Sequence, residues 1–232
     1  MGKRIIPQAR GKGSHTYRVK QRAFAVYPGY PSNLEGEWEV VKLIASPGHS
    51  VPIAKMINAK GDKFYNFAAN LLYVGQKINI GGSKNGDVAK LGDLKNGTEV
   101  FNIEHTQKDG GQFVRTGGNC ALILGREGDD IKIRMPSKQE KIFNANCRAT
   151  VGRAAADGRL EKPILKAGKH FHIMKTKSKL WPRTSGVKMN RIDHPFGSGR
   201  GKRIKSKIIK RNASPGRKVG LLRPRRTGRK KR

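Results

Sequence analysis

The chain has 232 residues, and its 50 Lys and Arg against 16 Asp and Glu give a formal net charge of +34. A charge of this size repels itself unless a polyanion neutralises it, so we expect an anionic partner. The longest apolar run has five residues, far fewer than the about 20 of a membrane span, and the two cysteines form no CxxC pair, which together predict an intracellular protein without a membrane partner.

Basic residues are concentrated toward the two ends of the chain. Residues 1–34 hold seven basic and no acidic residues, and residues 35–105 hold eight of each. Residues 106–180 hold sixteen basic and seven acidic residues, and residues 181–232 hold nineteen and one. Ends with so few apolar residues do not offset the entropy of ordering, so we expect them to be disordered until bound. The pattern predicts a folded centre with basic arms that follow a nucleic-acid backbone.

Residues 35–155 are typical of β-structure, because their apolar runs are short and are separated by Gly, Asn and Asp turns. Ile131 and Ile133 alternate with basic residues after the turn EGDD, which predicts a strand with one packed and one charged face. The expected strands are EWEVVKLIA (37–45), KFYNFAANLLYV (63–74), QKINIGG (76–82), TEVFNIEH (98–105), QFVRTGG (112–118), CALILGRE (120–127), DIKIRMP (130–136) and EKIFNANCRATVG (140–152).

A charge-neutral block followed by a basic block suggests two small β-barrels. Their junction is expected in KDGGQFVRTGG, residues 108–118, where Arg115 and Phe113 offer a charge and a stacking plane to RNA. An ordinary hinge between domains is an equal alternative for this loop. A short helix is also expected within residues 155–168, limited in length by Pro163.

Motifs of common enzyme classes do not occur, since the chain has no GxxxxGK[ST], GxGxxG, HExxH or GxSxG. His170 and His172 would lie on one side of a strand and could share a metal, but no third ligand is near, so no metal or cofactor is expected. Asp193 and His194 are adjacent, like part of an acid–base pair. Neighbours on an extended strand point to opposite faces, and Pro195 favours that conformation, so a direct contact between them is not expected.

The stretch RTSGVKMNRIDHPFGSGRGKR, residues 183–203, resembles the signature of the second universal large-subunit ribosomal protein, the L-two family. That signature has a Gly-Val-Ala-Met-Asn segment, then an Asp-His-Pro segment and glycines. GGQFVRTGGNCALILGREG (110–128), NCRATVGR (146–153) and the order of segments along the chain agree with it. The opening MGKRIIPQARGKGSHTYR and the basic tail resemble the archaeal and eukaryotic branch, and the modest length favours the archaeal one.

This chain departs from the family signature at four positions. Lys188 replaces the usual alanine, and Arg191 takes the place of a proline that is common in bacteria. Phe196 stands where bacterial members carry a second histidine, and Ser198 interrupts their run of glycines. The missing histidine weakens paired imidazole chemistry, and two of the changes add positive charge, so both effects favour docking over catalysis. The matching positions are Gly186, Val187, Met189, Asn190, Asp193, His194, Pro195, Gly197 and Gly199.

The resemblance implies a mainly β protein, with an OB-fold barrel followed by an SH3-like barrel and basic extended N- and C-terminal arms. The expected ranges are 1–34 for the N-terminal extension, 35–105 and 106–180 for the two barrels, and 181–232 for the C-terminal extension. It also implies a cytoplasmic, primary rRNA-binding protein near the peptidyl transferase centre that supports large-subunit assembly and subunit association. Its expected partners are large-subunit rRNA, other large-subunit proteins and the small subunit.

RNA docking by the signature is expected to use three kinds of contact. Glycines allow close main-chain approach, arginines grip phosphates, and Phe196 stacks on a base, with His194 at the innermost point of the loop. The residues expected to bind rRNA are Arg115, Gly186, Val187, Met189, Asn190, Arg191, Asp193, His194, Pro195, Phe196, Gly197, Gly199, Arg200 and Arg203.

Two alternatives to rRNA docking remain at the level of the sequence. In the first, His194 is a general acid or base in peptide-bond formation, although no partner residue, oxyanion donor or pocket is visible. In the second, the chain is a nonspecific DNA binder, which the basic arms alone would permit. The neutral first block and the signature argue against the second alternative.

Overall fold

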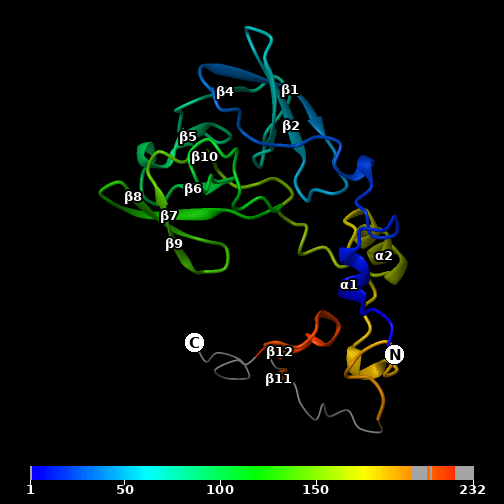
Figure 1. The fold of residues 1–232 in the computed structure, drawn as a ribbon. Helices are drawn as coiled ribbons and strands as arrows, with labels where there is room; N and C mark the ends of the chain where they lie inside the picture. The colour runs from blue at the N-terminus through cyan, green and yellow to red at the C-terminus, as the bar shows by residue number, and fades with distance from the viewer. Residues whose placement is uncertain (1, 200–207, 210, 223–232) are drawn as a thin grey trace. The chain divides into compact units, whose positions relative to one another are not determined.

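The structure is a computed structural model that describes residues 2–199, 208–209 and 211–222 (Figure 1). The chain divides into two compact units, one of Lys20–Lys177 and one of Met1–Val19 with Ser178–Arg232. We call the first the β unit and the second, which combines residues from both ends of the chain, the terminal unit.

The first sheet of the β unit has four antiparallel strands in the order β3-β2-β1-β4. In β1, Trp38 and Val40 are buried while the glutamates beside them are exposed, so one face packs and the other meets solvent. The ring of Trp38 meets that of Phe64 edge-on, with 4.7 Å between centroids, and this pair stabilises the core of the sheet. The strands are β1 (Glu37–Ile44), β2 (Ile53–Asn58), β3 (Lys63–Phe67) and β4 (Lys77–Asn79).

The second sheet has six antiparallel strands in the order β5-β10-β6-β7-β8-β9. Glu127 pairs with Asp130 across a two-residue turn, in which Gly128 has a φ of 63° that glycine adopts freely. Ile131 and Ile133 are buried, which confirms their predicted alternation. The strands are β5 (Val88–Lys90), β6 (Glu99–Phe101), β7 (Ala121–Glu127), β8 (Asp130–Arg134), β9 (Glu140–Asn144) and β10 (Arg148–Val151).

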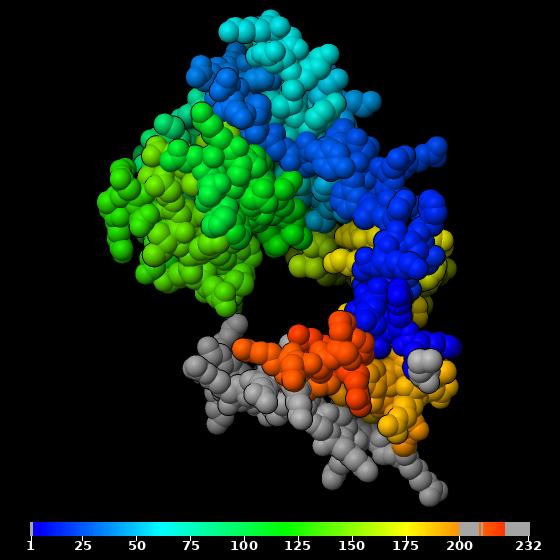
Figure 2. Space-filling model, in the orientation of Figure 1, coloured from blue at the N-terminus to red at the C-terminus, as the bar shows by residue number. Residues whose placement is uncertain are grey.

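The two sheets of the β unit pack together and share buried residues. Val88 and Phe101 belong to the second sheet but lie in the core of the first. Isolated bridges join Ala69 to Ala154 and Ile80 to Val88. In Figure 2 the cyan and green segments of this unit accordingly form one continuous surface.

The prediction of a mainly β protein is confirmed, but the strand list needs several corrections. The stretch expected as one strand at 140–152 forms two strands, β9 and β10, and the strand expected at 63–74 ends at Phe67. The sequence analysis missed β2, because IAKMIN contains Ala, Lys and Met, which do not favour strands, and it missed the three-residue β5. The strand expected at 112–118 is wrong, since this segment contributes only an isolated bridge between Phe113 and Ile103.

The second sheet takes strands from earlier in the chain than the sequence indicated. Its first strand begins at Val88, whereas the junction was expected in residues 108–118. The names OB-fold and SH3-like, and the four domain ranges, stay predictions.

The helix expected within residues 155–168 is wrong. These residues are mostly turn and irregular chain, and helix α2 covers Ala167–Thr176 instead. Pro163 has no N–H to donate and disfavours the α conformation in the residue before it, so the helix begins after the proline. His170 and His172 therefore lie about 200° apart around a helix axis, and not on one side of a strand.

The terminal unit contains the short helix α1 (Ile6–Gly11) and a parallel pair of two-residue strands, β11 (Ile208–Ile209) and β12 (Leu221–Leu222).

Over the described residues, no helix has the length and apolar content that crossing a bilayer requires. Short 3-10 helices occur in both units. They are η1 (Gln21–Ala23) and η2 (Leu91–Asp93) in the β unit, and η3 (Gly186–Lys188) and η4 (Pro215–Arg217) in the terminal unit.

A buried ion pair connects separate stretches of the β unit. Glu104 is fully buried and accepts hydrogen bonds from Arg148 Nε at 3.0 Å, from Arg148 Nη2 at 2.7 Å and from the main-chain N–H of Arg148 at 2.8 Å. The main-chain N–H of Gly110 donates to the same carboxylate at 3.2 Å. The Arg148 guanidinium also donates to Pro31 O at 2.8 Å and lies over the ring of Tyr30. One carboxylate thus holds β10, the loop after β6 and the segment before β1.

Replacement of Glu104 by alanine should destabilise the β unit strongly, because it leaves the Arg148 guanidinium largely buried without its counter-charge. We expect Glu104→Ala to lower the free energy of unfolding by about 3–5 kcal/mol. The control is Glu140→Ala, which removes a half-exposed partner of Lys132 and should cost less than about 1 kcal/mol. Urea denaturation of the full chain measures both, and equal losses would contradict the role of Glu104.

His49 is held as a neutral ring in the β unit. Its Nδ1 lies 2.7 Å from Ser46 Oγ, and its ring meets those of Phe24 and Phe67 edge-on. Burial lowers the pKa of His49, and the positive charge of Arg115 lowers it further. The imidazolium form is therefore disfavoured in the folded chain.

The β unit should lose stability as the pH falls below the ordinary histidine pKa of about 6.5. Below that pH the unfolded chain binds a proton at His49 that the folded chain, with its lowered pKa, does not bind. His49→Phe keeps an aromatic ring and does not titrate, so we expect it to lose less unfolding free energy between about pH 7.5 and about pH 5.5. Denaturation at both pH values compares the variant with the original chain, and identical losses would show that His49 does not cause the effect.

Candidate nucleic-acid interface

The signature segment of the terminal unit is a loop closed on itself by main-chain hydrogen bonds. The N–H groups of Asp193 and His194 both donate to Asn190 O, at 3.0 and 3.1 Å. The N–H of Ser198 donates to Met189 O at 3.1 Å and joins the two sides of the loop. These main-chain hydrogen bonds hold the two sides of the loop together.

Two of the signature glycines are required by packing inside this loop. A Cβ atom on Gly186 would lie 2.5 Å from Cε1 and Nδ1 of the His194 ring, closer than real contacts allow. A Cβ atom on Gly197 would meet the main-chain atoms of Met189 and Asn190 just as closely. From the sequence these glycines were expected to allow close approach of RNA, whereas their neighbours in the structure belong to the loop itself. Gly199 differs from these two glycines. It has a φ of 120°, and a Cβ atom added there would meet no atom within 4 Å.

The His194 ring is fixed on both of its sides by the loop. Its Nδ1 accepts the main-chain N–H of Phe196 at 3.0 Å, and the two rings lie 5.1 Å apart. Because Nδ1 is an acceptor, the neutral ring carries its proton on Nε2, which is therefore a hydrogen-bond donor. One side of Phe196 is used by this contact, which leaves the ring half-buried.

Residues from the other end of the chain lie against the signature loop. Lys3 donates its main-chain N–H to Ile192 O at 2.8 Å, and its Nζ lies 3.4 Å from the Asp193 carboxylate. Asp193 therefore forms an ion pair with Lys3 and not with its neighbour His194. The sequence analysis treated the two ends as separate arms, although one signal pointed to this pairing: Asp193 is the single acid of residues 181–232.

The loop presents only some of the predicted residues to solvent. Asn190, Arg191 and Pro195 are exposed, together with Gly199. Arg200 and Arg203 lie outside the described residues. The other predicted residues of the loop are half-buried or buried: Gly186, Val187, Met189, Asp193, His194, Phe196 and Gly197.

Arg115 belongs to the β unit, and its guanidinium is used within the fold. It donates to Gly111 O at 3.0 Å and to Pro28 O at 2.8 Å, and it lies over the ring of Phe67 at 4.8 Å. Burial lowers its pKa. These bonds use N–H donors of the guanidinium that would otherwise be free to bind a phosphate. RNA binding by Arg115 stays a prediction.

Phe113 also serves the packing of the β unit. Lys141 Nζ lies 3.7 Å above its ring, and Phe143 packs on it with 5.3 Å between centroids. Phe113 of loop 108–118 is thus packed against the second sheet. Within the part of the chain that the structure covers, no three His, Cys, Asp or Glu side chains gather to hold a metal ion.

Comparison with known proteins identifies the family. Residues 84–215 match the model of the C-terminal domain of ribosomal proteins L2. The large ribosomal subunit protein uL2 of Hyperthermus butylicus is 45% identical over 240 residues, and the match covers 100% of both chains. The chain belongs to the ribosomal protein L2 family. A member of this family is a structural protein of the ribosome and not an enzyme, and its location is the cytoplasm, within the ribosome.

A methyl group on Gly186 should displace the histidine of this L2-family loop. In Gly186→Ala the His194 ring has to move away from Cβ, so the Phe196 N–H loses its acceptor. We expect the Phe196 amide to exchange its hydrogen at least about tenfold faster, which corresponds to the loss of one hydrogen bond.

The control for Gly186→Ala is Gly168→Ala. Gly168 lies in α2, and a Cβ atom added there would meet no atom within 4 Å, so this change should leave Phe196 exchange unaltered. Unchanged exchange in Gly186→Ala, measured by NMR on the full chain, would mean that the glycine is not needed for this packing.

Proposed function

We propose that this chain is a primary rRNA-binding protein of the large subunit that lies near the peptidyl transferase centre and supports assembly and subunit association. The full-length likeness to a protein named for the large subunit supports the subunit assignment. The observation that carries RNA binding is a loop closed by main-chain hydrogen bonds in a strongly basic unit, with Asn190 and Arg191 exposed.

The loop offers three different groups to structured RNA. Arg191 and Lys188 are exposed cations that can neutralise phosphates, and Arg191 can do so with two parallel hydrogen bonds. Asn190 can donate to or accept from a base edge or a 2′-hydroxyl group. The Nε2–H of His194 adds a fixed donor. The phosphate contacts provide most of the affinity, and the fixed polar groups provide the register on the RNA.

The loop geometry gives no support to acid–base catalysis by His194. The ring nitrogen that an orienting carboxylate would occupy already accepts the Phe196 N–H, and Asp193 is paired with Lys3. A histidine held in this way positions a hydrogen bond and does not relay a proton.

Binding to large-subunit rRNA should be tighter than binding to duplex DNA at equal salt, because the loop fits splayed bases and 2′-hydroxyl groups that the duplex lacks. In Arg191→Ala the slope of log affinity against log salt should become less steep by about 0.7–0.9, the loss of one phosphate contact. The control Lys60→Ala removes an exposed cation from the turn between β2 and β3, and we expect it to leave the slope unchanged.

Filter binding over a range of salt concentrations measures these slopes. Equal affinity for duplex DNA and rRNA would contradict the proposed function and support nonspecific binding by charge. Equal slopes for Arg191→Ala and the original chain would show that Arg191 does not neutralise a phosphate of the RNA.

A further inference from the structure

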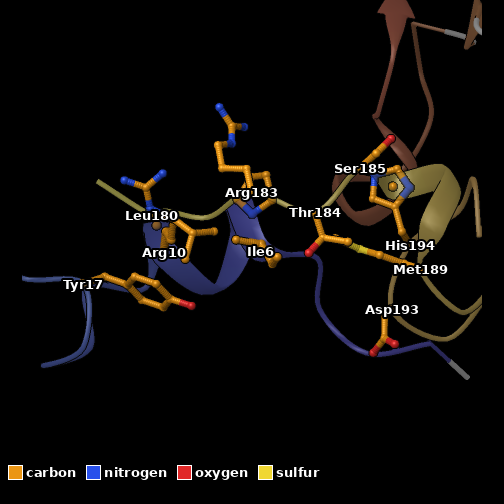
Figure 3. A pocket seen from close by; sticks show the side chains of 13 residues that line it. Ile6, Arg10, Tyr17, Leu180, Arg183, Thr184, Ser185, Met189, Asp193 and His194 are labelled. Atoms are coloured by element: carbon orange, nitrogen blue, oxygen red, sulfur yellow. The ribbon is translucent and has the colours of Figure 1, made fainter. Parts of the chain in front are cut away.

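A cavity of about 860 Å³ lies in the terminal unit, between α1 and the segment that leads into the signature loop. Figure 3 shows Tyr17 at one end of this cavity, Met189 and His194 at the other, and Ile6 of α1 between them. All its lining residues belong to the terminal unit. Its volume falls within the about 300–1,000 Å³ of sites that bind small organic groups.

The walls combine flat apolar surface with a few polar groups. Ile6 and Leu180 line the cavity, and the half-buried ring of Tyr17 offers a stacking plane. The hydroxyl groups of Thr184 and Ser185 line the same cavity and can each donate or accept a hydrogen bond. This mixture suits a flat heterocycle with polar edges better than an aliphatic chain.

His194 and Asp193 both line the cavity, and they differ in hydrogen bonding: His194 offers a donor and Asp193 an acceptor. Because Nδ1 of His194 accepts the Phe196 N–H, its remaining polar atom, Nε2, is a donor in the neutral ring. The Asp193 carboxylate is an acceptor with an oxygen to spare beside the one that faces Lys3. A nucleobase edge carries both acceptors and donors, which such a pair can read.

The charge around the cavity favours an anionic occupant, since its one acidic side chain, Asp193, is paired with Lys3. Arg10 and Arg183 line it, and residues 2–19 contain no acid. The chain's own tail, residues 200–232, also contains no acid and would be repelled by these arginines. A nucleotide brings an apolar ring for the walls and a phosphate for the arginines.

We propose that this cavity receives one unstacked nucleobase of rRNA, with the adjoining phosphate on Arg10 or Arg183. The inference rests on the proposed function and deepens it, since it adds the reading of one base to the phosphate contacts of the loop. Tyr17 stacks on the base at its own end of the cavity, and polar side chains farther along the cavity meet its edge. Structured RNA supplies such bases in loops and bulges.

Two substitutions test the cavity without changing its charge. Ser185→Trp fills it, and its control Ser137→Trp makes the same change at an exposed serine in the turn between β8 and β9. Tyr17→Ala removes the stacking plane, and Tyr17→Phe restores it. Full chains are bound to a large-subunit rRNA fragment, the affinity is measured over a range of salt, and the reactivity of each unpaired base is probed chemically.

We expect the original chain to protect at least one unpaired base. Ser185→Trp and Tyr17→Ala should expose that base again and weaken binding by about tenfold, within the about 5–150-fold that a stacked base contributes. The slope against salt should stay the same, since the phosphate contacts remain. Ser137→Trp and Tyr17→Phe should behave like the original chain.

Unchanged protection in Ser185→Trp, with rRNA binding intact, would overturn the base site and leave the proposed function standing. An ultraviolet cross-link from Tyr17 to residues 200–232 of the chain, with none to RNA, would overturn it too and identify the tail as occupant. Failure of the original chain to prefer rRNA over duplex DNA would instead overturn the proposed function itself.

Discussion

The Glu104 carboxylate is the interaction on which the β unit depends most. A group of this kind is stable in the interior only when each oxygen is bonded, and here one arginine side chain and two main-chain N–H groups bond it. Through Arg148 the bonds reach Pro31, ahead of the first strand. A single charge pair thereby ties two parts of the second sheet to each other and to the segment ahead of the first sheet, and the basic protein uses one of its few acids to do so.

The terminal unit follows a different principle, since it contains almost no apolar core. Main-chain hydrogen bonds and two glycines shape the signature loop, and Lys3 attaches the N-terminal residues to it. Most of the cations that the structure describes in this unit, such as Lys3, Lys188 and Arg191, are therefore exposed to solvent. A scaffold of this kind suits RNA, because its cations stay in solvent until phosphates replace the water around them.

The sequence predicted what depends on local pattern and missed what depends on distant contacts. The alternation of Ile131 and Ile133 identified β8, and the motif from Gly186 to Gly199 identified the family and the loop. The strand β2 escaped because Ala, Lys and Met do not favour strands, although pairing with both neighbours makes it central. The carbonyl partners of Arg115 have no local signature, so sequence periodicity does not reveal them.

In the signature loop, the backbone and two glycines determine the shape, whereas exposed side chains determine the charge. Lys188, Arg191 and Ser198, three of the positions at which this chain departs from the family signature, are exposed and make no side-chain contact that holds the loop. Gly186 and Gly197, which match the signature, are the positions where an added atom would deform it. In the RNA contact that we propose, exchange of these surface residues would therefore change the affinity, and with it the ionic strength at which a ribosome remains assembled, while the backbone of the loop keeps its shape.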